Sequence, residues 1–235
     1  MYRLNYIEHY QHQPPFQRLF VVGDVHGCYA DLMQALQAVA FDFDQDLLVS
    51  LGDLIDRGPE SLKCLDLLQQ PWFKAVLGNH EEMCLHSEHD RMMADLHCRH
   101  GGQWFYDLPL TERKRLIALV RQLPIVLEIE HQGQRLGFVH ADVDLNDWDA
   151  FKAEVQRNPE AAVWGRGRIR NNRPYRYRSV TGIDRVFLGH TVVNQVTRRD
   201  NCYYIDTGAV FGKHLSVIEI DIHRPVEQQV AVTVA

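Results

Sequence analysis

Short apolar runs alternate with longer amphipathic stretches in the first third of the chain. The runs Leu19–Val22, Leu47–Leu51 and Ala75–Leu77 are short enough to be buried strands, whereas the residues between them repeat their apolar positions at helical spacing. Strands that alternate with such helices favour right-handed crossovers and parallel pairing. Residues 18–80 are therefore predicted to form strand, helix, strand, helix and strand, with the three strands ending at one sheet edge.

The remainder of the chain has a different pattern. Residues 81–123 are predicted to be helical with a break at Gly101-Gly102, and Pro124–Glu130 and Arg135–His140 flank a short turn as the strands of a hairpin do. A mixed first half and a strand-rich second half favour an α/β fold of two stacked mixed β-sheets flanked by helices, an αββα sandwich. Further strands are expected at Arg185–Leu188, Cys202–Ile205, Leu215–Ile222 and Val226–Val234.

The bulk properties limit what the chain can be. Its 235 residues suffice for a single domain, predicted over residues 18–235 after an irregular lead-in over residues 1–17. A formal net charge of −6 gives no drive toward nucleic acid or an anionic membrane. No apolar run approaches the ~18 residues of a membrane span, and the start lacks the apolar core of a secretory signal. The five cysteines form no CxxC pair, so reduced thiols and a cytoplasmic location are expected.

Chemistry-bearing side chains follow the predicted strands at glycine turns. Oxygen and imidazole donors without thiolates suit Mn²⁺, Fe or Zn²⁺ better than Ca²⁺, and Asp53 is placed to bridge two such ions. Two divalent ions about 3.5–4 Å apart activate a bridging hydroxide for in-line attack on a phosphoryl group. The pattern therefore points to a two-metal hydrolase. Its candidate metal ligands are Asp24, His26, Asp53, Asn79, His140 and His190.

Three further residues lie beside the candidate ligands. Arg57 is placed to bind phosphate oxygens through two hydrogen bonds. His80 is placed to act as a general acid on the leaving oxygen, and Asp56 is placed to orient and charge His80.

These motifs resemble those of a known family. The sequences GDVHG at Gly23–Gly27, GDLIDRG at Gly52–Gly58 and GNHE at Gly78–Glu81, followed by His140 and Gly189-His190, are similar to the motifs of the PPP-type metallophosphoesterases. Within that family the chain resembles the lambda-phosphatase-like serine/threonine protein phosphatases of bacteria and phages, which include the Prp phosphatases. The resemblance covers residues 18 to 220. It implies a calcineurin-like metallophosphoesterase fold and phosphomonoester hydrolysis at a dinuclear centre, with Mn²⁺ as the expected metal.

The resemblance also assigns roles to individual positions. It assigns Asp24, His26 and Asp53 to one metal ion, and Asp53, Asn79, His140 and His190 to the other. It places Arg57, Arg166, Asn79 and His80 at the substrate, with both arginines on the phosphate, and it makes His80 and Asp56 the acid pair. One departure is Val192, which stands where many relatives carry proline.

Two charged or metal-binding patterns remain outside this assignment. The segment Gly165–Arg178 holds six arginines and two tyrosines, and it is interpreted as a phosphoprotein-binding surface or a solvated loop, with nucleic-acid binding disfavoured. Cysteines and histidines also crowd into residues 84–100, but their spacing matches no zinc pattern. That stretch is interpreted as a polar helix and loop over the rim of the site. The six arginines of the segment Gly165–Arg178 are Arg166, Arg168, Arg170, Arg173, Arg176 and Arg178.

Three functional hypotheses follow. The first is a phosphatase that hydrolyses phosphoserine and phosphothreonine in proteins by attack of a metal-bridging hydroxide, with His80 as the acid; phosphotyrosine and phosphohistidine are left open. The alternative is a symmetrical dinucleoside polyphosphate hydrolase, and the third is an inactive phosphoprotein-binding module. The expected partners are phosphorylated proteins, without a membrane. The native metal and the oligomeric state are left open.

Overall fold

The computed structural model describes residues 5–11, 16–170, 176–226 and 230–234. Its strands are β1 Asn5–Tyr10, β2 Leu19–Val22, β3 Leu47–Ser50, β4 Phe73–Ala75, β5 Pro124–His131, β6 Gln134–Val139, β7 Arg185–Leu188, β8 Thr197–Arg199, β9 Cys202–Tyr204, β10 Leu215–Glu219 and β11 Val230–Val234. Its helices are α1 Tyr29–Ala38, α2 Ser61–Asp66, α3 Asn79–His86, α4 Arg91–His97, α5 Gln103–Tyr106, α6 Leu110–Val120, α7 Trp148–Val155, α8 Glu160–Trp164 and α9 Gly167–Arg170. Short 3₁₀ or π turns are η1 Leu67–Gln69, η2 Cys98–Gly102 and η3 Ala209–Phe211.

The five-stranded sheet has the order β11-β10-β2-β3-β4. Strands β2, β3 and β4 pair in parallel, as their spacing with α1 and α2 predicts, and β10 pairs antiparallel to β2. Because β2, β3 and β4 run in one direction, the residues that follow them reach the same edge.

The six-stranded sheet has the order β1-β5-β6-β7-β9-β8. The predicted hairpin is confirmed as the antiparallel pair β5 and β6, while β7 pairs in parallel with β6. The irregular lead-in predicted for residues 1–17 is wrong at Asn5–Tyr10, which forms β1 and pairs in parallel with β5. The sequence prediction missed this strand because the segment is polar. Its backbone hydrogen bonds come from the ladder with β5.

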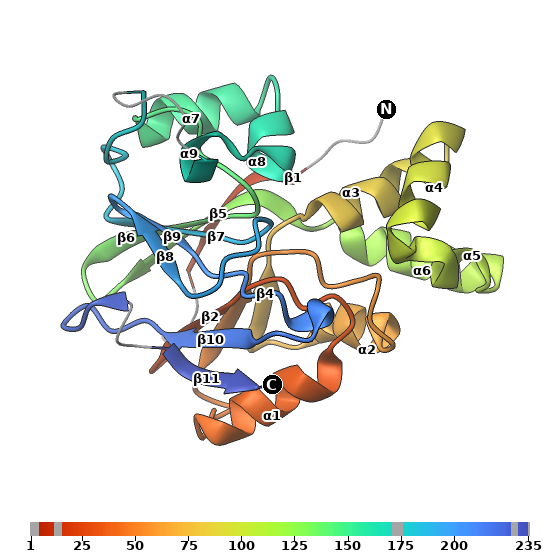
Figure 1. Cartoon of the computed structure of the whole chain (residues 1–235), viewed down its shortest axis with the longest axis horizontal. Helices are drawn as coiled ribbons and strands as arrows, with labels where there is room; N and C mark the ends of the chain where they lie inside the picture. Colours follow the sequence, from red (N-terminus) through yellow and green to blue (C-terminus); the bar gives the residue numbers. More distant parts are fainter. Residues whose placement is uncertain (1–4, 12–15, 171–175, 227–229, 235) are drawn as a thin grey trace.

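The two sheets stack face to face, and helices cover their outer faces (Figure 1). One apolar cluster fills the space between the sheets; it includes Val21 and Val49 from one sheet and Phe138 and Phe187 from the other, all fully buried. Alternate residues of the same strands face outward, where Phe20 and Leu48 join the second cluster beneath the helices. This arrangement confirms the predicted αββα sandwich and brings the ends of both parallel strand sets to one side.

Several elements were absent from the sequence prediction. Residues 141–184 contain α7, α8 and α9, and β8 precedes β9 at a sheet edge. The predicted helical stretch of residues 81–123 divides into α3, α4, α5 and α6, with the expected break at η2, where Gly101 has φ 102°. Among the described residues, no helix is both long and apolar enough to span a bilayer.

Candidate active site

The predicted site residues follow the carboxyl ends of strands from both sheets. Asp24 follows β2, Asp53 follows β3, and His140 and His190 follow β6 and β7. Asn79 is the first residue of α3, four residues after the end of β4. All of them are buried, with exposed fractions of 8% or less. The sandwich therefore gathers oxygen and nitrogen ligands from five strand ends.

The turns that carry these side chains have an unusual backbone. Among the residues with φ between 46° and 74° are His26, Asp53, Asp56, Arg57 and His190. Each such conformation is unfavourable for a residue with a Cβ, and it persists where surrounding contacts hold it. Backbone strain is therefore concentrated in the candidate site.

Close backbone packing explains two of the motif glycines. A Cβ on Gly58 would lie 2.1 Å from the carbonyl oxygen of His26, and one on Gly78 would lie 2.3 Å from the amide nitrogen of Asp53. No side chain fits at either place. Glycine therefore lets the turns after β2, β3 and β4 touch one another.

Glu81 stabilises the turn after β3 through hydrogen bonds to its backbone amides. Its buried carboxylate accepts hydrogen bonds from the amides of Asp53 at 2.8 Å, Leu54 at 2.8 Å and Gly78 at 3.1 Å. Burial, then the charge of Asp53, raises the pKa of Glu81 to about 8. The sequence prediction placed Glu81 in the third motif but gave it no role, and the structure shows that it fixes the backbone of Asp53.

Unprotonated atoms converge at one side of Asp53. The Nδ1 of His140 donates to the Leu51 carbonyl at 2.7 Å, so its Nε2 presents a lone pair. That lone pair lies 3.0 Å from Oδ1 of Asn79 and 3.5 Å from Oδ1 of Asp53, both acceptors. The Nε2 of His190 is buried and has no hydrogen-bond partner among the described residues. Three converging acceptors without a proton between them fit a cation.

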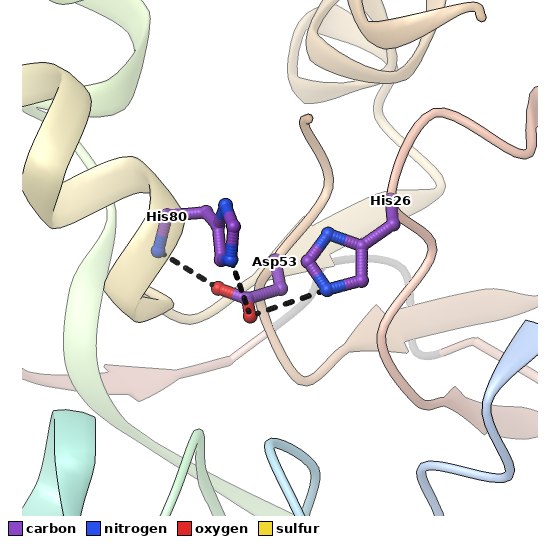
Figure 2. A group of neighbouring side chains, drawn as sticks. All are labelled: His26, Asp53 and His80. Carbon is purple, nitrogen blue, oxygen red and sulfur yellow. Dashed lines mark hydrogen bonds and ion pairs between the residues drawn. The ribbon is translucent and has the colours of Figure 1, made fainter. Parts of the chain in front are cut away.

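A second group lies on the other side of the same carboxylate. Ligand atoms of His26, Asp53 and His80 lie within 4.8 Å of one another, and those of Asp53, His140 and His190 meet the same limit. Figure 2 shows the rings of His26 and His80 on either side of Asp53. The Nδ1 of His26 donates to the Ile55 carbonyl at 2.8 Å, which leaves Nε2 facing Asp53 Oδ2 at 3.5 Å. Asp53 thus lies between two donor groups.

Asp24 is in neither group, although it lies at the same edge. Its carboxylate accepts a hydrogen bond from the backbone of His190 at 2.9 Å. Burial, then the charges of Asp206 and Asp53, raises the pKa of Asp24. Asp206 follows β9, and burial, then Asp53, raises its pKa to about 6. Asp206 was missed, although it follows the apolar run Cys202–Ile205 as the other candidates follow theirs.

The pKa directions separate the histidines into two kinds. Burial lowers the pKa of His26 to about 4 and that of His190 to about 3, and it lowers the pKa of His140. These rings are neutral near pH 7, as metal ligands must be. Burial also acts on His80, but the charge of Asp53 and the hydrogen bond to Asp56 outweigh it and raise the pKa. Only His80 among the four is therefore tuned to carry a proton.

His80 and Asp56 form the predicted pair. The Nδ1 of His80 donates to Oδ2 of Asp56 at 2.6 Å, and both side chains are fully buried. The Nε2 of His80 has no hydrogen-bond partner among the described residues. Two further groups, His97 and Trp104, also donate to Asp56. The sequence prediction placed His97 in a polar helix and loop over the rim of the site, whereas His97 is fully buried.

The two arginines that are predicted to bind phosphate, Arg57 and Arg166, lie in different surroundings. Arg57 donates to Nε2 of His26 and lies over the exposed ring of Phe211, 5.4 Å from its centroid. Arg166 is half-buried; burial, then the charge of Arg170, lowers its pKa, while Asp24 and Asp53 act in the opposite direction. Both arginines therefore lie within electrostatic reach of the ligand cluster.

Arg168 does not fit the interpretation of Gly165–Arg178 as an exposed arginine-rich segment. This side chain is 1% exposed, and its guanidinium donates to the carbonyls of Val143, Leu145 and Arg178 at 2.6–2.9 Å. Because these carbonyls belong to two separate segments of the chain, Arg168 holds the two segments together. Arg173 lies outside the described residues, and Arg170, Arg176 and Arg178 are exposed.

The donor set fits divalent cations. Neutral imidazoles, carboxylates and an amide oxygen without thiolates suit Mn²⁺, Fe or Zn²⁺. Asp53 faces both groups, as a bridging ligand requires, and the carbonyls of Ile55 and Leu51 orient the rings of His26 and His140.

The chain is similar to known proteins over most of its length. Residues 17–194 match the family model described as calcineurin-like phosphoesterase. The chain is 38% identical over 208 residues to "Serine/threonine-protein phosphatase 1" of Salmonella typhimurium, which covers 87% of this chain and 93% of the relative. It is 30% identical over 203 residues to "Bis(5'-nucleosyl)-tetraphosphatase, symmetrical" of Pasteurella multocida, which covers 79% of this chain and 67% of the relative. The structure titled as a putative diadenosine tetraphosphatase shares the fold at TM-score 0.68 and 22% identity, over 92% of this chain and 94% of that one.

Proposed function

We propose that the chain, which belongs to the calcineurin-like phosphoesterase family of hydrolases, removes phosphate from serine and threonine residues of proteins. The observation that carries this proposal is that Asp53 lies between two groups of buried donor atoms, beside His80, the one histidine among them whose pKa is raised. Such a site combines metal-assisted activation with one proton donor. Each of the two speeds the hydrolysis of a phosphomonoester with a poor leaving group.

Each ligand group would hold one divalent cation. The first comprises His26 and Asp53 with Asp24 at the same edge, and the second comprises Asp53, Asn79, His140 and His190. Polarisation of the phosphate and acidification of water is the chemistry that divalent cations supply at such a position when bound. We propose Mn²⁺ because this mixture of carboxylate, amide and imidazole donors suits it. The free cysteines of the chain suit a reducing compartment, so we place the enzyme in the cytoplasm.

The chain's own residues bind the phosphate and move the proton. Arg57 and Arg166 would hold phosphate oxygens, and Arg57 leaves Nε2 of His26 when it turns toward the substrate. His80 is held at Nδ1 by Asp56, so Nε2 is free to give its proton to the departing serine or threonine oxygen. The raised pKa of His80 keeps that proton in place before the reaction.

The substrate class rests on relatedness. The relatives named serine/threonine-protein phosphatase match at 34–38% identity over nearly their full length. Relatives named symmetrical bis(5'-nucleosyl)-tetraphosphatase match at 30–31% identity and over two thirds of their length or less. Dinucleoside polyphosphate hydrolysis is therefore the second candidate.

The test measures phosphate release from a phosphoserine peptide and from diadenosine tetraphosphate, side by side. Chelator-stripped protein is assayed with and without added Mn²⁺. Turnover that Mn²⁺ restores and that favours the peptide supports the proposal, whereas preference for the dinucleotide establishes the second candidate. Tight binding of the phosphopeptide without turnover of either substrate would identify an inactive binding module instead.

A further inference from the structure

Asp56 accepts more hydrogen bonds than its pairing with His80 needs. Its side chain is fully buried, and Oδ2 accepts from Nδ1 of His80 at 2.6 Å. Oδ1 accepts from Nε1 of Trp104 at 2.7 Å. Nε2 of His97 lies 3.1 Å from Oδ1 and 3.0 Å from Oδ2, so it donates between the two oxygens.

These donors fix the orientation of the carboxylate. Rotation about the bond to the carboxyl group would move Oδ1 away from Trp104 and Oδ2 away from His80 together. His97 is itself held, because the hydroxyl of Tyr106 lies within hydrogen-bond distance of Nδ1, at 3.1 Å. A donor therefore holds each oxygen, and a second residue holds the donor between them.

The chain between α4 and α5 is shaped to deliver both donors. His97 ends α4, η2 follows, and Trp104 lies in α5. Gly101 has φ 102°, and a Cβ there would lie 2.8 Å from the backbone nitrogen of Arg57. A Cβ on Gly102 would lie 2.2 Å from the ring of His97. The two glycines let the segment close tightly over the turn that carries Asp56.

We propose that His97 and Trp104 are positioning residues for proton transfer. They hold Asp56 so that its Oδ2 keeps Nδ1 of His80, and with it the Nε2 proton, aimed at the leaving oxygen. This inference rests on the proposed function, because it concerns the general acid of that reaction. Among the described residues, the side-chain hydrogen bonds of His97 and Trp104 to the turn after β3 go to Asp56 and not to Asp53, so losing either residue acts first on the acid pair.

The first test compares two matched tryptophan substitutions. Trp104→Phe removes one hydrogen bond to a buried carboxylate at the site, and Trp148→Phe removes one to Glu128 on the outer face of the six-stranded sheet, at 2.8 Å. Trp104→Phe is expected to lower kcat on a phosphoserine peptide about tenfold or more, the usual worth of a hydrogen bond to a charged group. Trp148→Phe should leave kcat unchanged.

The leaving group separates positioning from general damage. The 2,4-dinitrophenolate leaving group of 2,4-dinitrophenyl phosphate departs without protonation. Trp104→Phe should therefore lower kcat on this substrate by less than about twofold. His97→Leu should show the same split between substrates, and His97→Gln, which restores an N–H donor, should recover part of the peptide turnover. Equal losses on both substrates in Trp104→Phe and His97→Leu would overturn the proposal.

A second readout does not depend on turnover. In protein labelled with ¹⁵N-histidine, the Nδ1 proton of His80 should give a downfield signal that His80→Asn removes. Trp104→Phe and His97→Leu should shift that signal and speed its exchange with water, while Trp148→Phe should not. An unchanged signal in both site variants contradicts the inference even if the wild type prefers another substrate. Loss of wild-type phosphatase turnover with the expected signal changes would instead contradict the proposed function alone.

Discussion

Two buried carboxylate clusters in this protein are built in opposite ways. Glu128 on β5 accepts hydrogen bonds from Nε1 of Trp148 at 2.8 Å, Nζ of Lys152 at 3.0 Å and Nη2 of Arg135 at 2.8 Å. Burial alone would raise the pKa of Glu128, but these donors outweigh it and lower the pKa to about 2. The charge of this carboxylate is therefore balanced by two cationic side chains of the same chain, and an indole N–H adds a third hydrogen bond.

The strand-end cluster is not neutralised in this way. Burial and mutual repulsion raise the pKa of Asp24 and Asp206, and Nε2 of His190 has no hydrogen-bond partner among the described residues. Much of its backbone also has positive φ. The Glu128 cluster contributes to the stability of the fold, whereas the strand-end cluster is a group of buried polar side chains that could hold cations.

Substitutions in the two clusters should differ most in their effect on kcat. His80→Asn removes the proton donor and should lower kcat on a phosphoserine peptide by about 10²–10⁴. Glu128→Gln should change kcat by less than about twofold, because it lies outside the site. Steady-state kinetics on the two variants checks this, with an activated aryl phosphate as a second substrate. A similar loss in both variants, or on both substrates in His80→Asn, would refute the assigned roles.

The next effect is in the pH dependence of stability. The folded pKa of Glu128 is about 2 and its ordinary value is 4.5, so its contribution is fully present above pH 4.5 and is lost as pH falls toward 2. Between pH 6 and pH 3.5, wild type should lose about 1.5 kcal/mol more of its unfolding free energy than Glu128→Gln does. Urea unfolding of chelated protein at both pH values measures this. Parallel losses in the two proteins would exclude Glu128 as the source.

Asp24 and Glu128 are expected to affect the stability of the metal-free protein in opposite directions. In metal-free protein at pH 8, the buried charge of Asp24 opposes folding because its pKa is raised. Asp24→Asn should therefore raise the unfolding midpoint by about 2–4 °C, whereas Glu128→Gln should lower it. Thermal unfolding with a chelator present provides the measurement. If Asp24→Asn is destabilised like Glu128→Gln, the two clusters are not electrostatic opposites.

The last prediction concerns an exposed arginine next to the site, for which the smallest change is expected. Arg166 and Arg170 repel one another, whereas Arg157 pairs with Glu154 at 3.5 Å. Arg170→Gln should raise KM for an acidic phosphopeptide by about two- to threefold at low salt and have no effect at high salt. Arg157→Gln, also exposed, is the matched control. Equal changes in KM for the two variants would show a general charge effect and no local recognition.

The parallel arrangement of β2, β3 and β4 could be predicted from the sequence, and so could the residues that gather at its edge. Both follow from local rules: short apolar runs form strands, glycines allow tight turns, and strands of one direction end together. The same rules identified His80 and Asp56 as neighbours, because both lie in those turns. They also apply to Asp206, which the prediction overlooked.

The long-range contacts that surround those turns depend on the tertiary structure and could not be predicted from the sequence. His97 and Trp104 reach Asp56 across 41 and 48 residues of chain, and β1 finds its partner in β5 more than a hundred residues away. Arg168 is buried because carbonyls from distant turns surround it. Such contacts depend on how the sheets and helices pack, and spacing along the chain carries no signal for them.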